Sequence, residues 1–218
     1  MAELPFHFLV ACKLLAVDPN QEFNFQNSIS FKIDKSFDFA AGHFSAVLIA
    51  RSKHGQVSTW PLAKFNGNVF VVSPDSSDVT LTSQTIEHAI RENLIGAAEY
   101  LFNDNNELIR INFLNTESAA WTIFGSITNY YEQLIRAKLN LPLGITNLNG
   151  KYVVCGELKN APGKDEFYPY LHLMAHNPNY KFDKSGQRQF ITLVGEDLDF
   201  LIQQVRHAQD YYSAKIQE

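Results

Sequence analysis

The period of the apolar residues changes along the chain, and this change constrains the fold more than any other feature. Between residues 23 and 39 the large apolar residues fall on one parity, which is the period of a strand with one buried face. After about residue 84 they recur every three or four positions, as on an amphipathic helix. Strands followed by a mixture of helices and strands lack the strict alternation of a doubly wound sheet. The sequence therefore predicts an α+β fold.

We expect a mostly antiparallel sheet that draws on a strand-rich N-terminal third. The apolar run at residues 6–17 is interpreted as a core strand, and residues 44–50, which are apolar on both parities, as a central strand. Asn66-Gly67 is typical of a hairpin turn. Later strands are expected at residues 107–114, 151–159, 167–176 and 189–194. The second and third of these are predicted to pair as an antiparallel hairpin, with Pro169 indicating an edge position.

About three amphipathic helices are expected to pack on this sheet. Their apolar stripes run through residues 84–102, 117–139 and 196–215. Gly125, inside the second stripe, indicates close packing. The prediction is a single domain over residues 1–218, and residues 75–82 mark where a strand-rich part would be divided from a mixed C-terminal part.

The composition narrows the class of protein. Hydrophobic residues make up 45% of the chain, enough for a large core. The net charge of −5, from 18 Lys and Arg against 23 Asp and Glu, disfavours nucleic acid as a partner. Two cysteines cannot form a disulfide framework, which favours a reducing, cytoplasmic compartment. The apolar run at residues 6–17 is too short to span a membrane and contains Lys13, so we expect no membrane segment.

One short pattern carries possible chemistry. Alternation along the strand at 151–159 places Glu157 and Lys159 on the same face. This Glu-x-Lys resembles the second half of the PD-(D/E)-x-K nuclease pattern. The resemblance implies that the glutamate helps to hold Mg²⁺ or Mn²⁺ and that the lysine stabilises charge. The sequence departs from the pattern at Asn147, where an Asp is required, so Glu132 is the candidate for the missing carboxylate.

A second group combines tyrosine and histidine. On a strand, Tyr168, Tyr170, His172 and His176 share one parity, and their amphipathic side chains suit recognition of a ligand or a protein. Along a strand His172 and His176 are about 13 Å apart, too far to share a metal ion. On a helix they would share a face, but Pro169 and the alternation favour a strand.

The two cysteines are a third candidate. Cys12 or Cys155 could act as a nucleophile only beside a histidine that lowers the pKa of the thiol. Both lie in apolar runs, and this favours buried, unreactive thiols.

No complete catalytic motif is present, so the preferred hypothesis is a binding protein without a catalytic centre or cofactor. Its expected partner is another protein, and an exposed edge of the 151–176 hairpin would allow homo-oligomers by sheet extension. The first alternative is a metal-dependent hydrolase of the nuclease type that uses Glu157, Lys159 and Glu132, with Mg²⁺ or Mn²⁺. The second alternative is an acidic immunity or inhibitor protein with a cationic partner.

Overall fold

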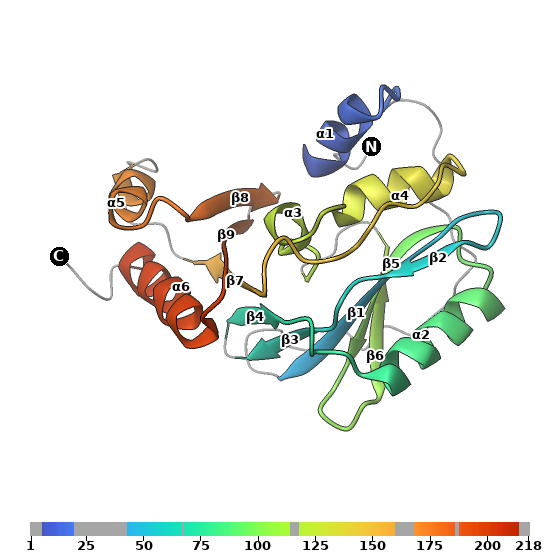
Figure 1. Cartoon of the computed structure of the whole chain (residues 1–218), viewed down its shortest axis with the longest axis horizontal. Helices are drawn as coiled ribbons and strands as arrows, with labels where there is room; N and C mark the ends of the chain where they lie inside the picture. Colours follow the sequence, from blue (N-terminus) through green and yellow to red (C-terminus); the bar gives the residue numbers. More distant parts are fainter. Residues whose placement is uncertain are drawn as a thin grey trace.

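The computed structural model describes residues 6–19, 43–66, 68–113, 118–159, 168–185 and 188–213. Within these residues the chain forms an α+β fold, as predicted, with nine strands and with six helices where about three were expected (Figure 1). Every pairing between the described strands is antiparallel. The strand predicted at residues 23–39 lies outside the described residues.

One sheet contains all the described strands. The strands are β1 (Phe44–Arg51), β2 (Val57–Thr59), β3 (Ala63–Asn66), β4 (Val69–Val72), β5 (Gly96–Phe102), β6 (Leu108–Asn112), β7 (Tyr152–Leu158), β8 (Lys181–Ser185) and β9 (Arg188–Gly195). Their order is β6-β5-β1-β3-β4-β7-β9-β8, and β2 also pairs with β1. The predicted central strand is confirmed, because β1 pairs with β5 on one side and with β2 and β3 on the other.

Helices cover both faces of this sheet (Figure 1). They are α1 (Phe6–Leu14), α2 (Val79–Arg91), α3 (Thr122–Gly125), α4 (Tyr130–Lys138), α5 (Tyr168–His176) and α6 (Leu198–Tyr212). On one face, which we call the α4 face, a core joins α1, α3 and α4 to strands β1, β3, β4, β5, β7 and β9. On the opposite face α2 packs under β1 and β5, while α5 and α6 pack under β7 and β9. The sheet joins strands from both sides of residues 75–82, and the division into domains stays a prediction.

The N-terminal apolar run is a helix, α1, and the strand prediction for residues 6–17 is wrong. Phe8, Ala11 and Cys12 are its buried residues, with the spacing of one helical face. Periodicity alone cannot separate a buried helix from a buried strand when both parities are apolar. The helix packs against α4 and β8, where His7 pairs with Asp183.

The segment predicted to be one helix, residues 84–102, is a helix up to Arg91 and a strand from Gly96. The helix begins earlier, at α2, because the Asp78 carboxylate caps it by accepting a hydrogen bond from the Leu81 N–H at 3.0 Å. It ends at Arg91, and the chain then passes through positive φ at Asn93 and Gly96. All seven residues of β5 are buried, so the apolar stripe that suggested a helix belongs to a strand covered on both faces.

The second predicted helix, at residues 117–139, is divided into α3 and α4. Asn129 begins α4 as its N-cap, accepting from the Glu132 N–H at 3.0 Å. The close packing predicted at Gly125 is confirmed, because a Cβ there would lie 2.6 Å from Cγ1 of Val153. The third predicted helix is confirmed as α6, which is capped by Asp197.

The hairpin predicted between residues 151–159 and 167–176 does not exist. Residues 168–176 form helix α5, and Pro169 sits in its first turn, where a missing backbone N–H carries no penalty. The true partners of β7 are β4 and β9, in a register that pairs Cys155 with Phe70 and Thr192. The edges of the described sheet are therefore β6 and β8. None of the described helices is both long enough and apolar enough to cross a bilayer.

Candidate functional site

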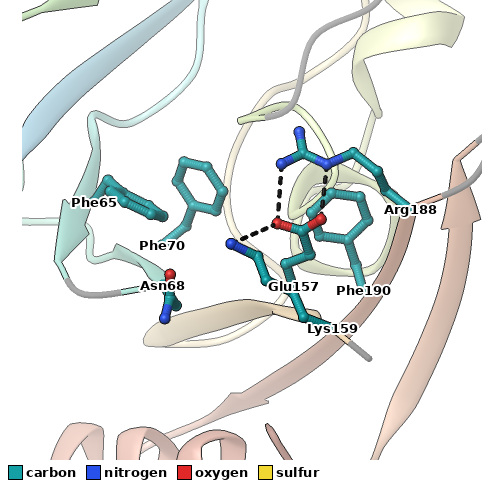
Figure 2. Close-up of a pocket in the computed structure, with 7 residues that line it drawn as sticks. All are labelled: Phe65, Asn68, Phe70, Glu157, Lys159, Arg188 and Phe190. Carbon is teal, nitrogen blue, oxygen red and sulfur yellow. Dashed lines mark hydrogen bonds and ion pairs between the residues drawn. The ribbon is translucent and has the colours of Figure 1, made fainter. Parts of the chain in front are cut away.

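A small pocket opens on the α4 face where β3, β4, β7 and β9 meet (Figure 2). It is lined by Phe65, Asn68, Phe70, Glu157, Lys159, Arg188 and Phe190. Two of these, Glu157 and Lys159, are the pair that alternation predicted on one face of the strand. The pocket encloses about 20 Å³, enough for about one water molecule.

A charge cluster forms the polar side of this pocket. Arg188 donates two hydrogen bonds to the Glu157 carboxylate, from Nε to Oε1 at 2.7 Å and from Nη2 to Oε2 at 2.9 Å. Lys159 Nζ lies 3.6 Å from Glu157 Oε2. Among the described residues two cations thus share this one carboxylate, and a cluster of cations suits an anionic ligand.

Aromatic rings form the apolar side. Phe65 and Phe70 flank the β3–β4 turn, with ring centroids 4.9 Å apart, and point toward the charge cluster (Figure 2). Phe44, at the start of β1, stacks on Phe65 at 4.5 Å and holds that ring in place. The predicted Asn66-Gly67 hairpin is thus confirmed by the β3–β4 pairing, and it supplies one wall of the pocket.

Helix α6 fixes the pocket from the opposite face of the sheet. The Gln209 side-chain amide donates to the backbone carbonyls of Asn68, at 3.0 Å, and Glu157, at 2.9 Å. This contact requires Gly156, since a Cβ there would lie 2.6 Å from Val205 Cγ1 and 2.7 Å from Gln209 Nε2. Gln209 therefore joins the β3–β4 turn to β7, the two segments that carry the pocket walls.

Two phenols hold the start of β9 beside Arg188. Tyr170 on α5 and Tyr212 on α6 both donate a hydrogen bond to the side-chain oxygen of Gln189. Tyr170 also packs edge-on against Phe182 at 4.8 Å. Tyr170 was predicted to bind a ligand, and in the structure it supports the pocket from behind.

A second carboxylate on the α4 face, Glu99 of β5, is completely buried. It accepts a hydrogen bond from the Ser118 N–H at 3.0 Å, and others from the Ser118 hydroxyl and the Asn112 amide. Asn112 lies directly opposite Glu99 in the β5–β6 register. Neutral donors thus occupy this carboxylate, which ties β5 to β6 and to the chain that leads into α3.

The remaining candidates lie elsewhere. Glu132, on α4, pairs with Arg136 at 2.9 Å and is not among the residues that line the pocket. His172 and His176 lie on α5, which packs on the opposite face of the sheet, and Tyr168 begins that helix. The sequence interpretation missed Arg188 and Phe190, although Phe190 lies on the predicted strand at residues 189–194 and Arg188, just before that strand, has the same parity.

Neither cysteine is a nucleophile of this site. Cys12 and Cys155 are both buried and free. Burial raises the pKa of the Cys155 thiol to about 12, and burial together with the Asp18 charge raises that of Cys12. Both thiols therefore stay protonated near neutral pH, as the apolar runs around them predicted.

The fold resembles that of enzymes named as a carboxylase ATPase subunit and as carboxyaminoimidazole ribonucleotide synthetases. The phosphoribosylaminoimidazole carboxylase ATPase subunit from Aquifex aeolicus matches with a TM-score of 0.64 and 16% identity, over 81% of this chain and 57% of that one. N5-carboxyaminoimidazole ribonucleotide synthetase from Thermotoga maritima matches with a TM-score of 0.64 and 19% identity, over 78% and 51% of the two chains. The Aspergillus clavatus synthase in complex with ADP and 5-aminoimidazole ribonucleotide matches with a TM-score of 0.61 and 13% identity, over 80% and 52%. No protein-family model and no curated protein sequence matches the chain.

These matches define an ATP-grasp-like fold. The chain spans about half the length of the solved structures it matches. The preferred hypothesis of a binding protein without a catalytic centre is contradicted, as are its nuclease and inhibitor alternatives, because the solved structures that share this fold are named as an ATPase subunit and as synthetases. The Glu-x-Lys resemblance misled because it covers only a few residues, whereas the match of the fold covers 81% of the chain.

Proposed function

We propose that this chain binds a nucleotide, ATP or ADP, as part of an ATP-grasp-like enzyme. The observation that carries the proposal is the fold itself, which matches the Aquifex ATPase subunit over 81% of this chain at a TM-score of 0.64. The Aspergillus protein of the same fold is described as a complex with ADP.

The pocket offers the groups that a nucleotide requires. The planar guanidinium of Arg188 and the ammonium of Lys159 suit phosphate oxygens. The rings of Phe65, Phe70 and Phe190 form the apolar side of the pocket, and since they are at most 7% exposed, a base packs on them only when the pocket opens. We therefore place the phosphates at the charge cluster and the base toward the rings.

The volume of the pocket dictates how a phosphate would enter. About 20 Å³ holds a water molecule but no phosphate. The Glu157 carboxylate occupies the donors of Arg188 that a phosphate would use, at 2.7 and 2.9 Å. A phosphate therefore binds only when it displaces Glu157 from Arg188, and Glu157 opposes nucleotide binding.

ATP-dependent enzymes commonly bring Mg²⁺ with the nucleotide. Among the described residues no three His, Cys, Asp or Glu side chains gather around a common point. The donors on Glu99 already occupy its carboxylate. A nucleotide-bound Mg²⁺ takes only one or two protein carboxylates beside the phosphates, and the proposal relies on Arg188 and Lys159 to offset the phosphate charge.

Calorimetric titration with ADP tests the proposal. We expect wild-type protein to bind, and Arg188→Ala to lose at least tenfold in affinity, about 1.4 kcal/mol. The control is Lys53→Ala. Lys53 is exposed and follows the end of β1 that lies away from the pocket, so its loss should leave the ADP affinity unchanged. Absence of ADP and ATP binding by the wild type would overturn the proposed function. Equal losses in the two variants would overturn the assignment of the phosphates to the pocket.

A further inference from the structure

We propose that His172 and His176 form a binding site for a divalent late transition metal ion, Cu²⁺ or Ni²⁺. The pair lies on α5, which packs against α6 on the face opposite the charged pocket. A helix brings residues four positions apart onto the same side, one turn from each other. Two histidines at this spacing on a helix are a known way to hold a metal ion.

The ring separation fits a chelate. The ring centroids of His172 and His176 are 4.5 Å apart, with an interplanar angle of 45°. Two imidazoles that share one ion at about 2.0 Å have centroids about 4.5 Å apart when the ligands are at right angles, and about 5.2 Å apart when they are tetrahedral. The observed separation is therefore within reach of a shared ion, and Cu²⁺ and Ni²⁺ are preferred because they stand above Zn²⁺ in affinity for such nitrogen ligands.

One of the two rings is already held in place. His172 stacks on Tyr211 of α6, with ring centroids 4.2 Å apart and planes within 12°. This stacking lowers the part of the entropic cost of binding that comes from ordering the His172 side chain. Tyr211 acts here as a positioning residue.

The site is open to an ion from solvent. His176 is exposed and His172 is half-buried. Among the described residues no third His, Cys, Asp or Glu side chain joins the pair, so water would complete the coordination. Because helix α5 exists only in the folded chain, an ion bound there also stabilises the protein.

Titration of the full chain with Cu²⁺, followed by calorimetry and electron paramagnetic resonance, tests this site. We expect one ion per chain with nitrogen coordination, and at least a tenfold loss of affinity in His176→Gln and in His172→Gln. The matched control is His207→Gln on α6, which should bind Cu²⁺ as the wild type does. The expected order of affinity is Cu²⁺, then Ni²⁺, then Zn²⁺.

A second variant separates metal binding from helix stability. Tyr211→Leu keeps the histidines and should weaken Cu²⁺ binding by a few fold, while circular dichroism shows whether each variant retains its helices. The proposal is overturned if His176→Gln binds Cu²⁺ as well as the wild type, if the wild type binds none, or if His207→Gln loses as much affinity. Tighter binding of Zn²⁺ than of Ni²⁺ would contradict the expected order of affinity.

Discussion

Two carboxylates on the α4 face of the sheet, Glu99 and Glu157, are held in opposite ways. Glu99 is completely buried and accepts hydrogen bonds from the neutral groups of Ser118 and Asn112. Glu157 keeps 17% of its side chain exposed and is held by the cations Arg188 and Lys159.

The difference separates a structural carboxylate from an exchangeable one. Of the donors around Glu99, Ser118 is buried with it and Asn112 is half-buried, and both would lose their partner without it, at about 1–3 kcal/mol for each buried group left unsatisfied. The cations around Glu157 reach solvent, with 34% of the Arg188 side chain and 42% of the Lys159 side chain exposed, so another anion can replace the carboxylate. The first carboxylate should therefore contribute to stability, and the second should control binding.

The largest expected effect is a loss of stability on replacement of Glu99, the buried carboxylate. Replacement of Glu99 by Ala leaves the Ser118 and Asn112 donors without an acceptor and opens a cavity in the core, so the free energy of unfolding should fall by about 3 kcal/mol. Urea denaturation measures the change. Glu132→Ala serves as the control, because its pair with Arg136 is partly exposed and its loss should cost less than about 1 kcal/mol. Similar losses in the two variants would contradict the structural role of Glu99.

The next effect concerns the packing behind Glu157. Gly156→Ala forces a Cβ to within 2.6 Å of Val205 and 2.7 Å of the Gln209 amide, so α6 must shift. We expect a loss of about 1–3 kcal/mol in stability and weaker ADP binding. Gly55→Ala is the control: its positive φ of 84° makes Ala strained, at about 1 kcal/mol, but no atom lies within 4 Å of the added Cβ. If the control weakens ADP binding equally, the packing explanation fails.

A smaller effect, of opposite sign on binding, is expected at Glu157 itself. Glu157→Gln removes the negative charge that competes for Arg188, so ADP affinity should rise by about threefold or more, while stability changes by less than about 1 kcal/mol. Calorimetry and urea denaturation on the same preparation measure both quantities. A lower ADP affinity in this variant would show that Glu157 supports the ligand instead of opposing it.

The smallest expected effect is a pH dependence on the opposite face of the sheet, where His88 of α2 lies 3.1 Å from the Tyr100 hydroxyl. Burial, and secondarily the Arg91 charge, lowers the pKa of His88 below its ordinary 6.5. The unfolded chain then binds the proton more tightly than the folded chain. The stability contributed by neutral His88 is therefore complete above pH 6.5, and it is lost as the pH falls through 6.5 toward the lowered value.

Urea midpoints measured between pH 8 and pH 5 test this dependence. In His88→Gln, the urea midpoint should fall less steeply below pH 6.5 than it does in the wild type. An equal fall of the urea midpoint in the variant would show that other groups cause the pH dependence.

Several elements could be predicted because local pattern and tertiary context agree. The stripe at residues 196–215 became α6, since acidic residues precede it and Asp197 caps it. The placement of Glu157 and Lys159 on one face followed from strand alternation, and both line the pocket. The protein partner and the homo-oligomer expected from sequence stay predictions, although the hairpin edge on which the oligomer depended is not in the fold.

Other elements could not be predicted, because the same residues fit two structures. Ala97, Ala98 and Leu101 fit a helical stripe, yet hydrogen bonding to β1 and β6 makes this segment the strand β5. The alternation at residues 168–176 indicated a strand, yet these residues form a helix that packs on α6. Local preference is worth less than the burial and backbone pairing that the rest of the chain offers.

The sequence by itself determined the α+β class, the central strand, the closing helix and the unreactive cysteines, because each depends on the local period or polarity of the chain. Only the tertiary structure decided which side chains meet. Arg188 reaches Glu157 across 31 residues through the β7–β9 register, and His172 reaches His176 because α5 is a helix. Strand register and sheet order arise from pairings between distant segments, and no local pattern records them.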